Sequence, residues 1–94
     1  MNPITIEGIT YETIDRTETE TLTLVSFDAE GGHWDIAVLV SEDREPYTTS
    51  DWQGEQPKTI KECPDFDWVR ASDWVFYDYG ARDVLDSITS VLGN

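Results

Sequence analysis

One histidine and one cysteine, His33 and Cys63, are the residues of this 94-residue chain best suited to nucleophilic or transition-metal chemistry. A structural zinc site takes four ligands, mostly Cys and His, and a catalytic zinc site takes three from the protein. A Cys–His nucleophilic pair needs a third group that orients the imidazole. The sequence offers neither arrangement, so we expect His33 to be a surface or turn histidine. We expect no enzyme activity, no metal centre and no cofactor.

Carboxylates are the most abundant reactive groups. The chain has 20 Asp and Glu against six Lys and Arg, which gives a net charge of −14. Close pairs such as Asp65 and Asp67 are of the kind that hydrolyse glycosides or bind Ca²⁺, but at this density such pairs arise by chance. The segment 28–32 also lacks the distal Glu of a calcium-binding loop. We therefore interpret the carboxylates as a charged surface.

A surface this anionic repels nucleic acid and anionic membranes and attracts basic clefts. The predicted partner is therefore a basic nucleic-acid-binding protein, with no direct contact to nucleic acid or to a membrane. The first residues, MNPITIEG, have no basic region or long apolar run, and no segment approaches the roughly 20 apolar residues of a membrane span. We expect a cytoplasmic protein.

Two groups of acidic residues are candidates for contact with such a partner. Glu18 and Glu20 alternate along a predicted strand, which places them on one face about 6.6 Å apart, a spacing similar to that of successive phosphates. Alternatively, they only solvate the outer face and protect a sheet edge. In the second group, acids adjoin aromatic residues that are typical interface anchors. Alternatively, most of these aromatic residues form the core, which otherwise has few large aliphatic side chains. The predicted partner-binding residues are Glu18, Glu20, Glu42, Asp43, Glu45, Asp51, Trp52, Asp65 and Asp67.

The elements that must position these residues are predicted from periodicity. A two-residue periodicity with many β-branched residues indicates an antiparallel hairpin over residues 19–40. Two short extended segments are predicted on either side of the turn signal at Glu7 and Gly8. The apolar residues of 84–92 share one helical face, which ends at Gly93. Residues 41–64 have few aliphatic side chains and are interpreted as a long irregular segment.

The remaining segments complete a single domain. Residues 65–71 predict a turn or two of helix, and the aromatic residues of 73–79 predict a strand. The predicted fold over residues 1–94 is α+β: a small antiparallel sheet of three to five strands, covered by a C-terminal amphipathic helix.

The size of the chain and its balance of acids and aromatics resemble those of small phage-encoded anti-CRISPR proteins. The resemblance lies in composition and involves no shared motif. It implies an inhibitor that imitates DNA, occupies the basic groove of a CRISPR effector complex and blocks target binding in the host cytoplasm. By this resemblance, the carboxylates that face Lys and Arg of the partner are those of Glu18, Glu20, Glu42, Asp43, Glu45, Asp65 and Asp67.

Three other interpretations remain open. An immunity protein against a nuclease toxin would use the same electrostatic attraction toward a different target. A domain adapted to high salt would carry its acids for solvation alone, and the presence of only two lysines fits this interpretation. The third alternative is a subunit of a larger assembly whose acids only keep it soluble.

Overall fold

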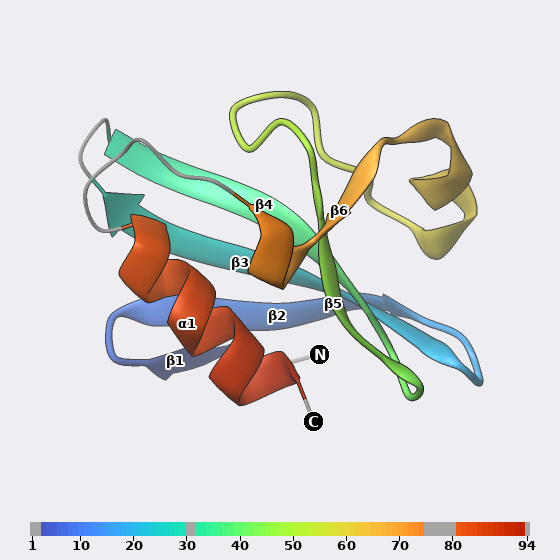
Figure 1. The fold of residues 1–94 in the computed structure, drawn as a ribbon, viewed down its shortest axis with the longest axis horizontal. Helices are drawn as coiled ribbons and strands as arrows, with labels where there is room; N and C mark the ends of the chain where they lie inside the picture. Colours follow the sequence, from blue (N-terminus) through green and yellow to red (C-terminus); the bar gives the residue numbers. More distant parts are fainter. Residues whose placement is uncertain (1–2, 30–31, 75–80, 94) are drawn as a thin grey trace.

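The computed structural model describes residues 3–29, 32–74 and 81–93. Six strands form one sheet in which each strand pairs antiparallel with the next along the chain, and a C-terminal helix packs on one face (Figure 1). The predicted α+β fold is confirmed, with one strand more than the upper bound of the prediction. The strands are β1 (Ile4–Ile6), β2 (Ile9–Arg16), β3 (Glu20–Ala29), β4 (Gly32–Ser41), β5 (Arg44–Thr49) and β6 (Trp68–Arg70), and the helix is α1 (Ala81–Leu92).

The predicted central hairpin is confirmed as β3 and β4. Their pairing is continuous over ten residue pairs, from Glu20 opposite Ser41 to Ala29 opposite Gly32. The predicted turn between the first two strands is also confirmed, because Glu7 and Gly8 both have positive φ, 53° and 81°. Such a two-residue turn matches the twist of the strands that it joins.

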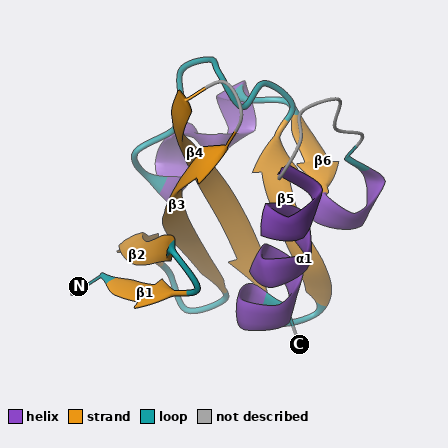
Figure 2. Cartoon of the chain, turned by 90° about the vertical axis from the view of Figure 1, so that its left-hand side faces the viewer, coloured by secondary structure: helices purple, strands orange, loops and turns teal. Residues whose placement is uncertain are grey.

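The sheet buries side chains on both faces. Val25, Ile36 and Val38 face α1 and pack with Ile88 of that helix. The neighbouring positions point the other way, because side chains alternate along a strand. There Leu22 and other apolar residues pack against Cys63 of the 3₁₀ helix η1 (Ile60–Asp65). Figure 2 shows α1 alongside the sheet.

Two predicted segments differ from the structure. Residues 41–64 are less irregular than expected, because they contain β5 and most of η1. The helix predicted over residues 65–71 is wrong: η1 ends at Asp65 and the chain then forms β6, whose Val69 pairs with Thr48 of β5. Pairing with β5 gives these backbone groups hydrogen-bond partners that a single helical turn would not supply.

The strand predicted over residues 73–79 lies mostly outside the described residues. Its first residue, Asp73, belongs to the 3₁₀ helix η2 (Ala71–Asp73), and Trp74 caps the end of that helix by donating its backbone N–H to the carbonyl of Ala71. Residues 75–79 are not among those described.

The Gln56 side chain occupies the edge of β4 where β5 no longer pairs with it. β5 pairs with β4 only from Val38 to Ser41. The N–H of Ala37, one residue before this stretch, donates instead to Oε1 of Gln56 at 3.0 Å. The hydroxyl of Thr49 donates to the same oxygen at 2.7 Å. The Gln56 amide NH₂ in turn donates to the carbonyls of Asp51 and Gly54. One side chain therefore fastens the loop after β5 to the sheet.

We expect Gln56→Ala to lower the free energy of unfolding by about 2 kcal/mol, because it leaves the buried Ala37 N–H without its side-chain acceptor and leaves the Thr49 hydroxyl only its longer bond, of 3.4 Å, to the carbonyl of Asp51. Urea denaturation followed by circular dichroism measures this change. Gln53→Ala is the matched control, since the Gln53 side chain is exposed on the same loop, and we expect a change under about 0.5 kcal/mol. Equal effects of the two variants would contradict the role of Gln56.

Candidate functional site

Two acidic turns lie at the same end of the sheet (Figure 1). One is the β2–β3 turn at residues 17–19 and the other is the β4–β5 turn at residues 42–43. Residues of both turns line adjoining surface hollows of about 510 and 310 Å³. We call residues 16–20 and 41–45 the acidic end. It brings together five of the predicted carboxylates, those of Glu18, Glu20, Glu42, Asp43 and Glu45.

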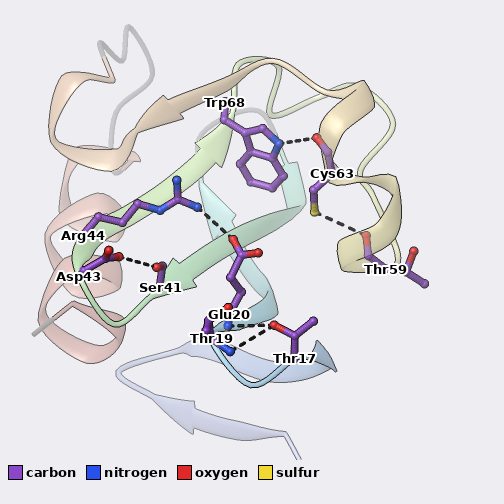
Figure 3. Close-up of polar contacts among 9 residues, drawn as sticks. All are labelled: Thr17, Thr19, Glu20, Ser41, Asp43, Arg44, Thr59, Cys63 and Trp68. Carbon is purple, nitrogen blue, oxygen red and sulfur yellow. Dashed lines mark hydrogen bonds and ion pairs between the residues drawn. The ribbon is translucent and has the colours of Figure 1, made fainter.

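Thr17 forms the β2–β3 turn. Its hydroxyl oxygen accepts the backbone N–H groups of Thr19 and Glu20 at 3.3 and 3.0 Å, and its own N–H donates to the carbonyl of Glu20 at 2.9 Å (Figure 3). Hydroxyl side chains commonly bond the backbone in this way in turns. The expectation that Glu18 and Glu20 share one strand face is therefore wrong, because Glu18 lies in the turn and Glu20 begins β3.

Arg44 is held within the acidic end by a carboxylate and an aromatic ring. Its Nη2 lies 3.2 Å from Oε2 of Glu20 (Figure 3), and its guanidinium carbon lies 4.4 Å from the centroid of the Tyr47 ring. On the neighbouring strand, Arg70 contacts Asp73 at 2.6 Å and Glu45 at 3.9 Å. The sequence did not reveal the role of Tyr47, because the ring meets Arg44 only once both lie in β5.

Charge at the acidic end remains negative after these contacts. The acidic end has five carboxylates and two arginines, Arg16 and Arg44, and a third arginine, Arg70 of β6, contacts Glu45. The Ser41 hydroxyl donates to Oδ1 of Asp43 at 2.8 Å, which orients that carboxylate without neutralising it (Figure 3). The acidic end can therefore attract a cationic partner.

The other predicted residues lie elsewhere. Asp65 ends η1, and Asp67 lies just before β6, where its carbonyl accepts the N–H of Ser50. Asp51 caps the loop after β5 by accepting the N–H of Gln53 at 3.0 Å. These carboxylates are exposed but line none of the hollows of the acidic end.

Trp52 is buried rather than exposed. Only 4% of it is accessible, and its indole N–H donates to the hydroxyl of Thr48 at 3.3 Å. Its ring packs against Phe27, Trp34 and Trp74 with centroids 5.7 to 6.1 Å apart. The polar sequence around Trp52 concealed this cluster, which assembles from four separate segments of the chain.

Carboxylates also lie on other surfaces. Asp83 and Asp86 are exposed on α1, and Asp28 and Asp35 are exposed near the tip of the β3–β4 hairpin. The acidic end therefore differs from the rest of the surface by joining two turns around shared hollows, and not by being the sole acidic region.

Cys63 is poorly suited to nucleophilic chemistry. It is buried against the sheet, and burial is the main cause that raises the pKa of its thiol from 9.0 to about 11, with further contributions from Glu20 and Asp15. Its Sγ lies 3.5 Å from the carbonyl of Thr59, and its own carbonyl accepts the indole N–H of Trp68 at 2.8 Å (Figure 3).

The described ranges contain no group of three or more His, Cys, Asp or Glu placed to hold a metal ion. A membrane-spanning helix would need more length and apolarity than any helix of these ranges has. Comparisons with protein-family models, with curated proteins and with solved structures find no match. The function must therefore be argued from geometry and charge.

We expect alkylation of Cys63 at pH 8 to be about 100-fold slower in the folded protein than in urea, because the thiolate is the nucleophile and burial raises the pKa of the Cys63 thiol to about 11. Because the thiol of the folded protein ionises near pH 11, its alkylation rate should still rise as the pH is increased above 9. Iodoacetamide labelling followed by mass spectrometry measures both rates. Equal rates in the folded and unfolded chain would show that the thiol is accessible and ionises normally.

Proposed function

We propose that this protein is an acidic inhibitor that imitates nucleic acid and occupies the basic DNA-binding groove of a partner protein. A CRISPR effector complex is the favoured partner by the resemblance in composition, and a nuclease toxin is the alternative. The observation that carries the proposal is the acidic end, where two turns and the strand residues next to them place five carboxylates around adjoining hollows.

The overall charge density supports the proposal. The longest dimension of the molecule is 35 Å, and a DNA duplex of that length carries roughly 20 phosphate charges. The chain has a net charge of −14, so it approaches the charge of the duplex that it would replace. Such a body attracts a basic groove and accelerates the encounter with it, and the attraction weakens as salt screens the charges.

The contacts of the chain's own Arg44 support the proposal by analogy, because they are made between a guanidinium group and residues of this surface. A carboxylate from β3 and a ring from β5 hold it from two directions. Arginines of a basic groove carry the same group, and carboxylates are its preferred partners. The neighbouring carboxylates of Glu42 and Asp43 extend this arrangement along the turn.

A second function is favoured by a different observation. Carboxylates lie on α1, on the hairpin tip and on the loops as well as at the acidic end. A domain adapted to high salt needs acids on all sides for solvation and no particular partner. The two functions differ in how the protein responds to salt.

We expect the triple variant Glu42→Lys, Asp43→Lys and Glu45→Lys to weaken binding to the partner at least about tenfold, since it replaces attraction by repulsion at the acidic end. The partner is first captured from a bacterial lysate and eluted with duplex DNA, and its affinity is then measured by titration calorimetry. The matched control is Glu7→Lys, Glu55→Lys and Asp83→Lys. Each triple variant changes the net charge from −14 to −8.

Equal weakening by both triple variants would show that total charge matters and the acidic end does not. Failure of duplex DNA to elute any captured protein would contradict the proposed imitation of nucleic acid. Circular dichroism of each variant verifies that the fold is retained, which is expected because five of the six residues are exposed and the sixth, Glu45, is only half-buried.

We also expect the protein to be folded at about 0.1 M KCl and to bind its partner less tightly as salt rises. Far-UV circular dichroism at about 0.1 and 3 M KCl measures the first expectation. A chain that folds only at the higher concentration would be adapted to brine, because its carboxylates would then need a high salt concentration to overcome their mutual repulsion.

A further inference from the structure

His33 lies between two carboxylates at the tip of the β3–β4 hairpin, by which we mean the paired residues 26–29 and 32–35. Its Nδ1 is 2.9 Å from Oδ1 of Asp28, and its Nε2 is 3.3 Å from Oδ1 of Asp35. Asp28 is its cross-strand neighbour in β3. Ser26, the cross-strand neighbour of Asp35, donates its hydroxyl to the same Oδ1 at 2.5 Å. The four side chains share the face of the sheet that points away from α1, since Phe27 and Trp34 between them pack on the α1 side.

Both contacts of the ring are satisfied only by the imidazolium ion. A neutral imidazole has one N–H, and its other nitrogen presents a lone pair. An ionised carboxylate accepts hydrogen bonds and cannot donate one. In either neutral tautomer, one carboxylate therefore faces a lone pair and that contact becomes repulsive. The contact to Asp35 is the longer one, and Asp35 keeps the hydroxyl of Ser26, so we expect this contact to be lost first.

We propose that His33, Asp28 and Asp35 form a pH-sensitive latch, which fixes the tip of the β3–β4 hairpin while His33 is protonated and releases it when the imidazole loses its proton. Among the described residues, the charged groups that contact His33 are Asp28 from β3 and Asp35 from its own strand. The loop that lines the hollow beside it contributes the uncharged residues Gln53, Gly54 and Gln56.

The direction of the pH dependence follows from these contacts. The hydrogen bond with Asp28 is the largest cause that raises the pKa of His33 above 6.5, and the charge of Asp35 adds to it. A folded-state pKa above the unfolded value means that the latch stabilises the tip fully below the unfolded pKa. This stabilisation is lost as the pH rises through the folded-state pKa. Because the ring is largely exposed, added salt weakens the effect.

The aromatic cluster of the core adjoins this part of the hairpin on the opposite face of the sheet. Trp34 follows His33 in β4 and packs against Phe27 and Trp52 with ring centroids 5.9 and 6.0 Å apart. His33, Trp34 and Asp35 also line a hollow of about 400 Å³ together with the loop after β5.

The test uses the single histidine of the chain, whose Hε1 resonance in NMR reports one imidazole. In the wild type we expect a His33 pKa above 6.5, and we expect Asp28→Asn and Asp35→Asn each to lower it toward that value. Asp67→Asn is the matched control, because it removes one charge at the start of β6 and should leave the His33 pKa unchanged. Equal pKa values in all three variants would overturn the latch and assign the shift to the overall charge.

Hydrogen exchange of backbone amides supplies the second measurement. We expect the protection factors of the amides near the hairpin tip to fall several-fold as the pH rises through the His33 pKa. In His33→Gln, which is uncharged at every pH, the same protection factors should not change over this range. Protection factors in the wild type that stay constant across the titration would overturn the proposal even if the pKa is raised.

Discussion

The antiparallel pairing of β3 with β4 is the constraint on which the rest of the structure depends. Its ten-pair register decides which side chains face α1 and which face η1. A slip of one residue would exchange the two faces, because side chains alternate along each strand. The same register places Glu20 and Ser41 at one end of the hairpin and Asp28 and His33 near the other. The acidic end and the proposed latch are therefore opposite ends of one element.

Uncharged polar side chains secure much of the loop structure of this acidic chain. Carboxylates can hold backbone N–H groups, as Asp15 does by accepting the N–H of Ile60 at 2.7 Å and thereby tying η1 to β2. They cannot bind carbonyl groups, since an ionised carboxylate has no donor. Gln56 supplies both functions after β5, and Thr17 closes the β2–β3 turn. The charged surface and the loop contacts are in large part separate sets of residues.

The ion pairs of the surface offset little of the charge repulsion. Those of Arg44 and Arg70 are at least partly exposed, and exposed pairs contribute about 0 to 1 kcal/mol each. A net charge of −14 in so small a body opposes folding. The apolar clusters on both faces of the sheet must outweigh this repulsion.

Local periodicity in the sequence determined the β3–β4 hairpin, the turn at Glu7 and Gly8 and the helix over residues 84–92, because each depends on neighbours along the chain.

Only the tertiary structure decided the rest. Pairing with β4 and β6 makes a strand of β5 in a segment with few aliphatic residues. The alternation of Thr and Glu concealed the turn at Thr17, since threonine suits both strands and turns. Trp52 is buried by rings from distant segments. Glu18 and Glu42 line the same hollow only because two turns lie at the same end of the sheet. Such contacts between distant segments leave no periodic signal in the sequence.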